Sequence, residues 1–135
     1  MRIFQQAIIA SQLLLSGCAS LPQACLPPAR AMLSAEMFFG RSVGSRVVSD
    51  GEFTAFLASE ITPRFPDGLT VIEARGQWRN GERGAILREP SKLVKIIFAD
   101  DAQKRADLDA IAESYKKRFH QQSVLIALQP SCVSF

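Results

Sequence analysis

Apolar residues recur at every second position in four segments of the chain, which is the period-two pattern of β-strands. In the third segment the other positions are largely apolar too, which indicates a central strand. The second and third segments flank Asn80-Gly81, a dipeptide typical of tight hairpin turns. The four predicted strands are residues 32–39, residues 69–79, a run that ends at Phe98, and residues 123–129.

Three residues are expected to disturb these strands. Gly76 lies where the alternation of the second strand blurs, so we expect a bulge there. Pro90 and Pro130 donate no backbone hydrogen bond. We therefore expect an irregular third strand near Pro90 and the end of the fourth strand at Pro130.

Two further segments repeat their apolar residues every three to four positions, which predicts amphipathic helices. The first begins at Ser49, whose spacing to Glu52 is that of a capping box, and it ends before Pro63. The second begins after Asp100 and Asp101, which place negative charge at its N-terminus. The apolar stripes are Phe53, Phe56, Leu57 and Ile61 in the first helix, and Leu108, Ile111, Ala112, Tyr115 and Phe119 in the second.

The order of elements is strand, helix, strand, strand, helix, strand. With right-handed crossovers, a split βαβ arrangement gives a four-stranded antiparallel sheet of order 4-1-3-2, with both helices on one face. We therefore predict an α+β, ferredoxin-like βαββαβ domain over residues 32–135. The face without helices would carry Glu36, Phe38, Leu93, Lys95, Ile97, Leu125 and Ala127.

The N-terminal residues are organised like an export signal. Arg2 precedes an apolar run, residues 3–15, that is too short to span a bilayer. The segment Leu15-Ser16-Gly17-Cys18 resembles the lipobox of bacterial lipoproteins, in which the cysteine is lipidated and becomes the new N-terminus. We predict a signal peptide over residues 1–17, a lipidated tether over residues 18–31, and attachment to a membrane through Cys18.

The residues after Cys18 bear on the choice of membrane. Ala19-Ser20 lacks the aspartate that is associated with inner-membrane retention in enteric bacteria, so we expect the outer membrane, facing the periplasm. A plain secretory cleavage nearby is the alternative, and the chain is exported in either case.

Cys25 and Cys132 are the two thiols that remain if Cys18 is lipidated. Because the periplasm is oxidising, a disulfide between them is the economical expectation, and two free thiols are the alternative. The predicted topology supports the disulfide, since the end of the last strand lies near the start of the first.

Composition and charge narrow the functional classes. A chain of 135 residues with 47% hydrophobic side chains has room for one domain with a core. The net charge of +3 is scattered along the chain, which does not suit nucleic-acid binding. The only histidine, His120, is not accompanied by a cluster of metal-ligand spacing. We expect no cofactor and no metal.

Six segments together carry a resemblance to a known family. They are MFFGRS, TPRFPDGLTV, GQWR, REPSKLV, YKKRF and SCVSF. In this order they resemble the bacterial family catalogued as domain of unknown function 3574 (DUF3574). That family includes lipoproteins and has no assigned activity, so the resemblance implies a class and not a function. The loop over residues 41–49 departs from the pattern, because it lacks the proline or Asp-Gly turn expected there.

The apolar residues on the open face suggest the first functional hypothesis. So much apolar surface is rarely left in water. Two copies could pack these faces together, as ferredoxin-like α/β-barrel dimers do, or an unidentified periplasmic protein could cover them. The alternative is that the hairpin tip or the tether folds over the face.

A polar ligand site on the hairpin is the second hypothesis. Trp78 could stack on a ring or a sugar while Arg79 or Arg88 holds an anion. The alternative is that these side chains have structural roles. The candidate ligand-binding residues are Arg64, Gln77, Trp78, Arg79, Arg88, Glu89, Ser91 and Lys92.

Catalysis is the third hypothesis. Tyr115, Arg118 and His120 cluster at the end of the second helix, and a tyrosine or a histidine could act as a general acid or base. No Ser/His/Asp, Cys/His or paired-carboxylate motif can be recognised. We expect a non-catalytic binding or assembly module, with a small hydrolase- or isomerase-like enzyme of the dimeric α/β-barrel type as the alternative.

Overall fold

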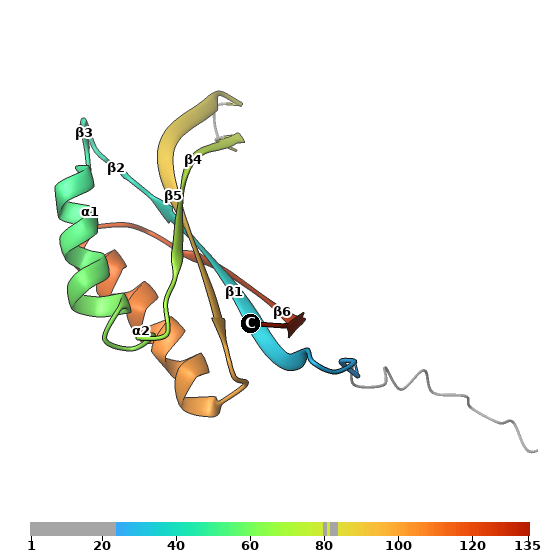
Figure 1. Cartoon of the computed structure of the whole chain (residues 1–135). Coiled ribbons are helices and arrows are strands. Elements are labelled where there is room, and N and C mark those ends of the chain that lie inside the picture. The colour runs from blue at the N-terminus through green and yellow to red at the C-terminus, as the bar shows by residue number, and fades with distance from the viewer. Residues whose placement is uncertain (1–23, 80, 82–83) are drawn as a thin grey trace, which may run out of the picture.

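Both helices lie on one side of a four-stranded antiparallel sheet in the computed structural model, which describes residues 24–79, 81 and 84–135 (Figure 1). The strand order β4-β5-β1-β6 is the predicted one, so the chain has the α+β, ferredoxin-like fold. The expected signal peptide and Cys18 lie outside the described residues. The elements are β1 (Arg30–Gly40), β2 (Ser42–Val43), β3 (Arg46–Val47), α1 (Asp50–Phe56), η1 (Leu57–Ile61), β4 (Thr70–Arg79), β5 (Ile86–Phe98), α2 (Ala102–Phe119) and β6 (Leu125–Val133).

The β4–β5 hairpin keeps one register along its whole paired length. The bulge expected at Gly76 is wrong, because Gly76 pairs directly with Glu89 within that register. The irregularity expected at Pro90 is also wrong. The Pro90 carbonyl accepts a hydrogen bond from the Arg41 N–H at 3.0 Å, so it faces the end of β1. Because the nitrogen and the carbonyl of one strand residue point to the same side, the Pro90 nitrogen also faces β1. The missing N–H therefore removes no hydrogen bond between β4 and β5.

Strand β6 is longer than the sequence predicted. It continues through Pro130, which pairs with Leu33, and ends at Val133. The expectation that Pro130 ends the strand is wrong because β6 lies at the edge of the sheet, where a proline nitrogen that faces solvent interrupts no ladder. Strand β1 also begins earlier than predicted, with Arg30 opposite Val133.

A disulfide joins Cys25 and Cys132, whose Cα atoms are 5.5 Å apart. This is the pairing expected from the sequence, and it ties the segment before β1 to strand β6. The start of β1 and the C-terminus therefore lie at the same end of the sheet, while the β4–β5 hairpin projects from the other end (Figure 1).

Capping side chains define where both long helical segments begin. The Ser49 Oγ accepts a hydrogen bond from the Glu52 N–H at 3.2 Å, and the Glu52 carboxylate accepts one from the Ser49 N–H at 2.8 Å, which is the predicted capping box. At α2, the Asp101 carboxylate accepts a hydrogen bond from the Lys104 N–H at 3.0 Å. No helix in the described part of the chain is long and apolar enough to span a membrane.

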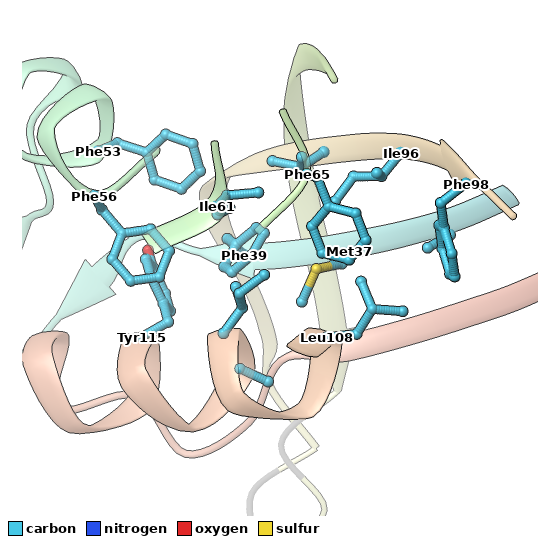
Figure 2. Packing of buried hydrophobic residues seen from close by; sticks show 14 of the residues in the cluster. Met37, Phe39, Phe53, Phe56, Ile61, Phe65, Ile96, Phe98, Leu108 and Tyr115 are labelled. Carbon is cyan, nitrogen blue, oxygen red and sulfur yellow. The ribbon is translucent and has the colours of Figure 1, made fainter. Parts of the chain in front are cut away.

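The core fills the space between the helices and the covered face of the sheet (Figure 2). Phe39 of β1 packs edge-on against Phe53 of α1 and Tyr115 of α2, with ring centroids 5.5 and 4.7 Å apart. Each such aromatic pair contributes about 0.5–1.5 kcal/mol beyond its area burial. The predicted helix stripes are buried here, except that Leu57 is only partly buried.

The other face of the sheet carries no helix, and apolar side chains remain exposed on it. Ile97 is 36% exposed and Leu125 is 62% exposed. At the end of β1 the sheet narrows to two strands, because residues 86–90 of β5 pair with β4 alone. This two-stranded extension, formed by residues 75–79 and 86–90, makes one wall of the site described next.

Candidate functional site

A groove of about 780 Å³ lies on the helix-free face, where the two-stranded extension meets the end of β1 and the segment after α2. We call it the open-face groove. Its floor comes from alternate residues of β1, β4 and β5, which share the face opposite the core. The lining residues that matter most for its chemistry are Phe38, Gly40, Gly76, Trp78, Glu89 and Leu125.

The side chain of Glu89 lies over two glycines of neighbouring strands. A Cβ atom on Gly40 would lie 2.5 Å from the Glu89 Oε1, and one on Gly76 would lie 3.6 Å from its Cγ. Glycine at these positions therefore makes room for the side chain, which lies partly buried across the β1 and β4 backbones. The Glu89 Oε2 accepts a hydrogen bond from the Ser42 N–H at 3.1 Å, which fixes the carboxylate in this place.

Glu89 has no ion-pair partner among residues 24–79, 81 and 84–135. Other carboxylates of the sheet do have one: Glu73 pairs with Lys92, and Glu36 pairs with Lys95 at 3.3 Å. The groove thus has a negative charge on its floor that one backbone N–H holds in position.

Apolar side chains form two sides of the groove, and polar residues of the segment after α2 form another part of its lining. Trp78 is 46% exposed and Leu125 is 62% exposed on opposite sides of the floor. The Gln121 Nε2 donates a hydrogen bond of 2.8 Å to the Ser42 carbonyl, which ties the segment after α2 to the residue that holds Glu89. His120 ends α2 in the left-handed conformation and lies on the same rim.

Four of the predicted ligand-binding residues contact the open-face groove: Gln77, Trp78, Glu89 and Ser91. The Gln77 side chain leaves β4 toward the opposite face, where it accepts a hydrogen bond from Arg88. Of these four, only Trp78, Glu89 and Ser91 therefore face the groove. The arginines of that prediction lie elsewhere. Because side chains alternate along a strand, Arg79 and Arg88 are on the face opposite Trp78. The stacking and the anion contact that were predicted together are therefore on different sides of the hairpin.

A second hollow, of about 910 Å³, lies along the hairpin and includes Arg88. There the Arg88 Nε donates a hydrogen bond of 2.8 Å to the Gln77 Oε1. The hollow also contacts Glu73, Arg75 and Glu89, so charges of both signs line it. It has no buried group that would select one kind of ligand.

Lys92 belongs to a partly buried ion cluster. Its Nζ is 2.7 Å from the Asp50 Oδ1 and also pairs with Glu73, and Arg41 lies 3.2 Å from the same Asp50 oxygen. The hydrogen bond from Lys92 holds the pKa of Asp50 below its usual value. Burial alone would lower the pKa of Lys92, but its bonds to Asp50 and Glu73 outweigh burial and raise it. The cluster joins the start of α1 to β4, β5 and the end of β1.

Arg64 is also engaged within the protein, outside the groove. It lies after η1, where its guanidinium is 3.1 Å from the Glu60 carboxylate and donates to the Glu60 carbonyl. The structure therefore places both Arg64 and Lys92 away from the other predicted ligand-binding residues.

The three residues of the catalytic hypothesis point in different directions. The Tyr115 hydroxyl is in the core and donates a hydrogen bond of 2.8 Å to the Gly40 carbonyl. Burial raises the pKa of Tyr115 well above its usual value, so the phenol stays neutral near pH 7. Arg118 approaches the Ser59 Oγ of η1, and only His120 reaches the groove.

Sequence reasoning missed the residues that shape the groove. Gly40 and Ser42 lie far from Glu89 and Gln121 in the chain and meet them only through the β1–β5 pairing and the end of α2. The sequence offered one signal of the groove, which is the glycine in each of the first two long strands, Gly40 and Gly76. From the sequence alone, Gly76 was interpreted as a bulge. Within the described residues there is no group of three or more His, Cys, Asp and Glu side chains that could hold a metal ion.

The comparison with protein families gives a direct assignment. The model of the family described as "Protein of unknown function (DUF3574)" matches residues 34–135. The chain belongs to the DUF3574 family. This confirms the resemblance seen in the sequence, and the open-face groove lies within the matched DUF3574 region. No curated protein has significant sequence similarity to the chain.

A phage SAM lyase and CutA are two proteins whose solved structures have a similar fold. A phage SAM lyase in complex with S-methyl-5'-thioadenosine is 17% identical, with a TM-score of 0.59 over 86% of this chain and 97% of the lyase. CutA from Synechococcus elongatus is 12% identical, with a TM-score of 0.51 over 77% of this chain and 80% of CutA. At such identities these matches show that the DUF3574 domain shares their fold.

Proposed function

We propose that this DUF3574 protein is an exported, lipid-anchored binding module whose ligand site is the open-face groove. The observation that carries the proposal is Glu89, a carboxylate held over Gly40 and Gly76 on the floor of a groove of about 780 Å³. Pockets for small molecules have volumes of this order and combine apolar walls with a few placed polar groups. The phage SAM lyase of similar fold was solved with a small molecule bound, which makes a small-ligand site on such a fold reasonable.

The groove is tested with two variants of β4 that add the same bulk on the same face. Ala74→Phe places a ring in the groove, whereas Thr70→Phe places one outside it. The exported protein carrying Cys18→Ser is purified from the periplasm without reductant and weighed by native mass spectrometry. We expect a retained small-molecule mass in the parent and in Thr70→Phe, and its loss in Ala74→Phe. Retention by all three forms would place the ligand elsewhere, and a bare parent protein would count against the binding function.

Export and anchoring remain proposals that the Cys25–Cys132 disulfide supports, because stable disulfides form in oxidising compartments. We expect the wild-type protein to fractionate with the outer membrane and to incorporate labelled palmitate. Cys18→Ser should release it into the soluble periplasmic fraction. Unchanged fractionation of Cys18→Ser would contradict the lipid anchor.

Self-association through the open face is proposed as well. Ile72, Ile97 and Leu125 are 45%, 36% and 62% exposed on this face, and a second copy would remove them from water. Native mass spectrometry of the protein at micromolar concentration should give a dimer, and Leu125→Asp should give a monomer. A monomeric parent would instead direct attention to a periplasmic partner protein, to be sought by crosslinking in intact cells.

A small hydrolase- or isomerase-like enzyme is the second candidate. The observation in its favour is that His120 and Glu89 line the same groove, so that a base and a carboxylate face one space. Turnover of a screened substrate that is lost in His120→Ala, at unchanged stability, would support it. Equal turnover in His120→Ala would exclude His120 as the base.

A further inference from the structure

The charge at the floor of the open-face groove limits the kind of ligand that it can hold. Glu89 accepts one hydrogen bond, from the Ser42 N–H, and has no cationic partner in the described residues. Arg75 also contacts the groove, but it follows Ala74 in β4, so its side chain leaves the strand toward the opposite face. A partly buried carboxylate in this situation favours a positively charged group beside it and disfavours an anion.

The walls limit the ligand further. Trp78 and Phe38 contribute aromatic rings to the groove, and Leu125 contributes an aliphatic surface. The indole face attracts organic cations through its quadrupole and also packs against apolar groups. A bare metal ion would need several ligands, and no group of three or more His, Cys, Asp and Glu side chains that could hold one occurs among the described residues. An organic cation with an apolar body therefore fits the groove better than a metal ion.

We infer that the open-face groove binds a small organic cation, with its charged group at Glu89 and its apolar part against Trp78. The inference rests on the proposed function, because it specifies the ligand class of the same groove. Gly40 and Gly76 acquire a direct role in it, since they let the carboxylate lie on the floor where a ligand can reach it. If Glu89 served only to bind the Ser42 N–H, the exposed aromatic ring of Trp78 beside it would have no role.

Trp78 provides the measurement, because it is the only tryptophan in the sequence and it lines the groove. The probes are three molecules with one phenyl ring and a cationic, a neutral or an anionic head group: phenethylammonium, 2-phenylethanol and 3-phenylpropanoate. Each is titrated into the non-reduced domain while the Trp78 emission is followed. We expect the cation to bind at least about tenfold more tightly than the neutral alcohol, and the anion to bind more weakly than either.

Glu89→Gln is the decisive variant because it removes the charge and keeps the shape. It should abolish the preference for the cation, whereas Glu36→Gln, on the same face but outside the groove, should keep it. If Glu89→Gln does not fold, the salt dependence of the wild-type protein gives the same information. The preference for the cation should shrink as ionic strength rises, since salt screens the attraction.

The two proposals fail differently in this experiment. Equal binding of the three probes, or tighter binding of the neutral or anionic probe, would overturn the organic-cation inference and leave the groove as a binding site. The same holds if Glu89→Gln and Glu36→Gln retain the preference equally. If no probe changes the Trp78 emission at millimolar concentration, both the inference and the groove as a small-molecule site are overturned.

Discussion

The hydroxyl of Tyr115 donates a hydrogen bond of 2.8 Å to the carbonyl of Gly40. Tyr115 belongs to the buried aromatic cluster under the helices (Figure 2), and Gly40 forms part of the groove floor beneath Glu89. One hydrogen bond therefore connects the core on one side of the sheet with the candidate site on the other.

Replacing Tyr115 by Phe should lower the free energy of unfolding by about 1–2 kcal/mol, because the hydrogen bond is lost and the Gly40 carbonyl loses its buried partner. Urea denaturation followed by circular dichroism measures the change. Lys117→Ala, an exposed change on the same helix, serves as the control and should have little effect. Equal stability of Tyr115→Phe and the wild type would show that the hydrogen bond contributes nothing.

The pKa of Tyr115 predicts how stability changes in alkali. Burial raises this pKa above the value of 10.0 expected in the unfolded chain, so the folded state holds its proton more tightly. The stabilising contribution is complete below pH 10.0 and is lost as the pH rises above that value. The free energy of unfolding should thus fall less steeply above pH 10.0 in Tyr115→Phe than in the wild type. Parallel curves for the two proteins would contradict this.

Gly40→Ala should displace the Glu89 carboxylate, because the added Cβ would lie 2.5 Å from its Oε1. The displaced side chain loses its part-buried hydrogen bond from Ser42, and because only the flexible end of Glu89 must move we expect a cost of about 0.5–1.5 kcal/mol. A double-mutant cycle with Glu89→Ala isolates the effect. In the Glu89→Ala background Gly40→Ala should cost clearly less, and an equal cost in both backgrounds would mean that the glycine is needed for another reason.

Loss of the Cys25–Cys132 disulfide should destabilise the domain by about 4 kcal/mol, since the bond closes a long loop in the unfolded chain. The paired variant Cys25→Ser/Cys132→Ser is compared with the wild type by urea denaturation, and reduced wild-type protein should match the variant. A difference between reduced protein and variant would indicate that the serines themselves perturb the fold.

The ion cluster around Lys92 predicts an acid-sensitive contribution. The hydrogen bond from Lys92 lowers the pKa of Asp50 below its usual value of 3.8, so this contribution is present above pH 3.8 and is lost as the pH falls below it. Because Asp50 is exposed, the effect is modest. Lys92→Met should reduce the loss of stability in acid, as measured by urea denaturation between neutral and low pH. An unchanged acid profile would show that Lys92 and Asp50 do not interact appreciably in solution.

The fold was predictable because local patterns and topology rules agree in this chain. The capping box of Ser49 and Glu52, the helix stripes and the four alternating segments leave one plausible sheet order, which the structure has. The errors at Pro90 and Pro130 have one cause. Whether a strand tolerates proline depends on which side its nitrogen faces, and that is set by the neighbouring strands and not by the local sequence.

The site was less predictable, since its residues are brought together by strand pairing over long separations. The sequence indicated a polar hairpin but could not divide it between two faces, so that Trp78 and Arg88 were assigned to one site. Lys92 looked available for a ligand, because its partner Asp50 comes from a distant helix N-terminus. Gly40 and Gly76 are visible in the sequence, but the pairing of β1 and β4 with β5 is what decides that Glu89 fills the room they leave.

The disulfide and the groove lie at opposite ends of strand β1. Strand β1 runs from the end that holds Cys25 and Cys132 to Gly40 at the groove, and its 11 residues span roughly 35 Å. If the segment before Cys25 is fixed to a bilayer, the groove lies at the end of the sheet that is farther along β1 from the point of attachment.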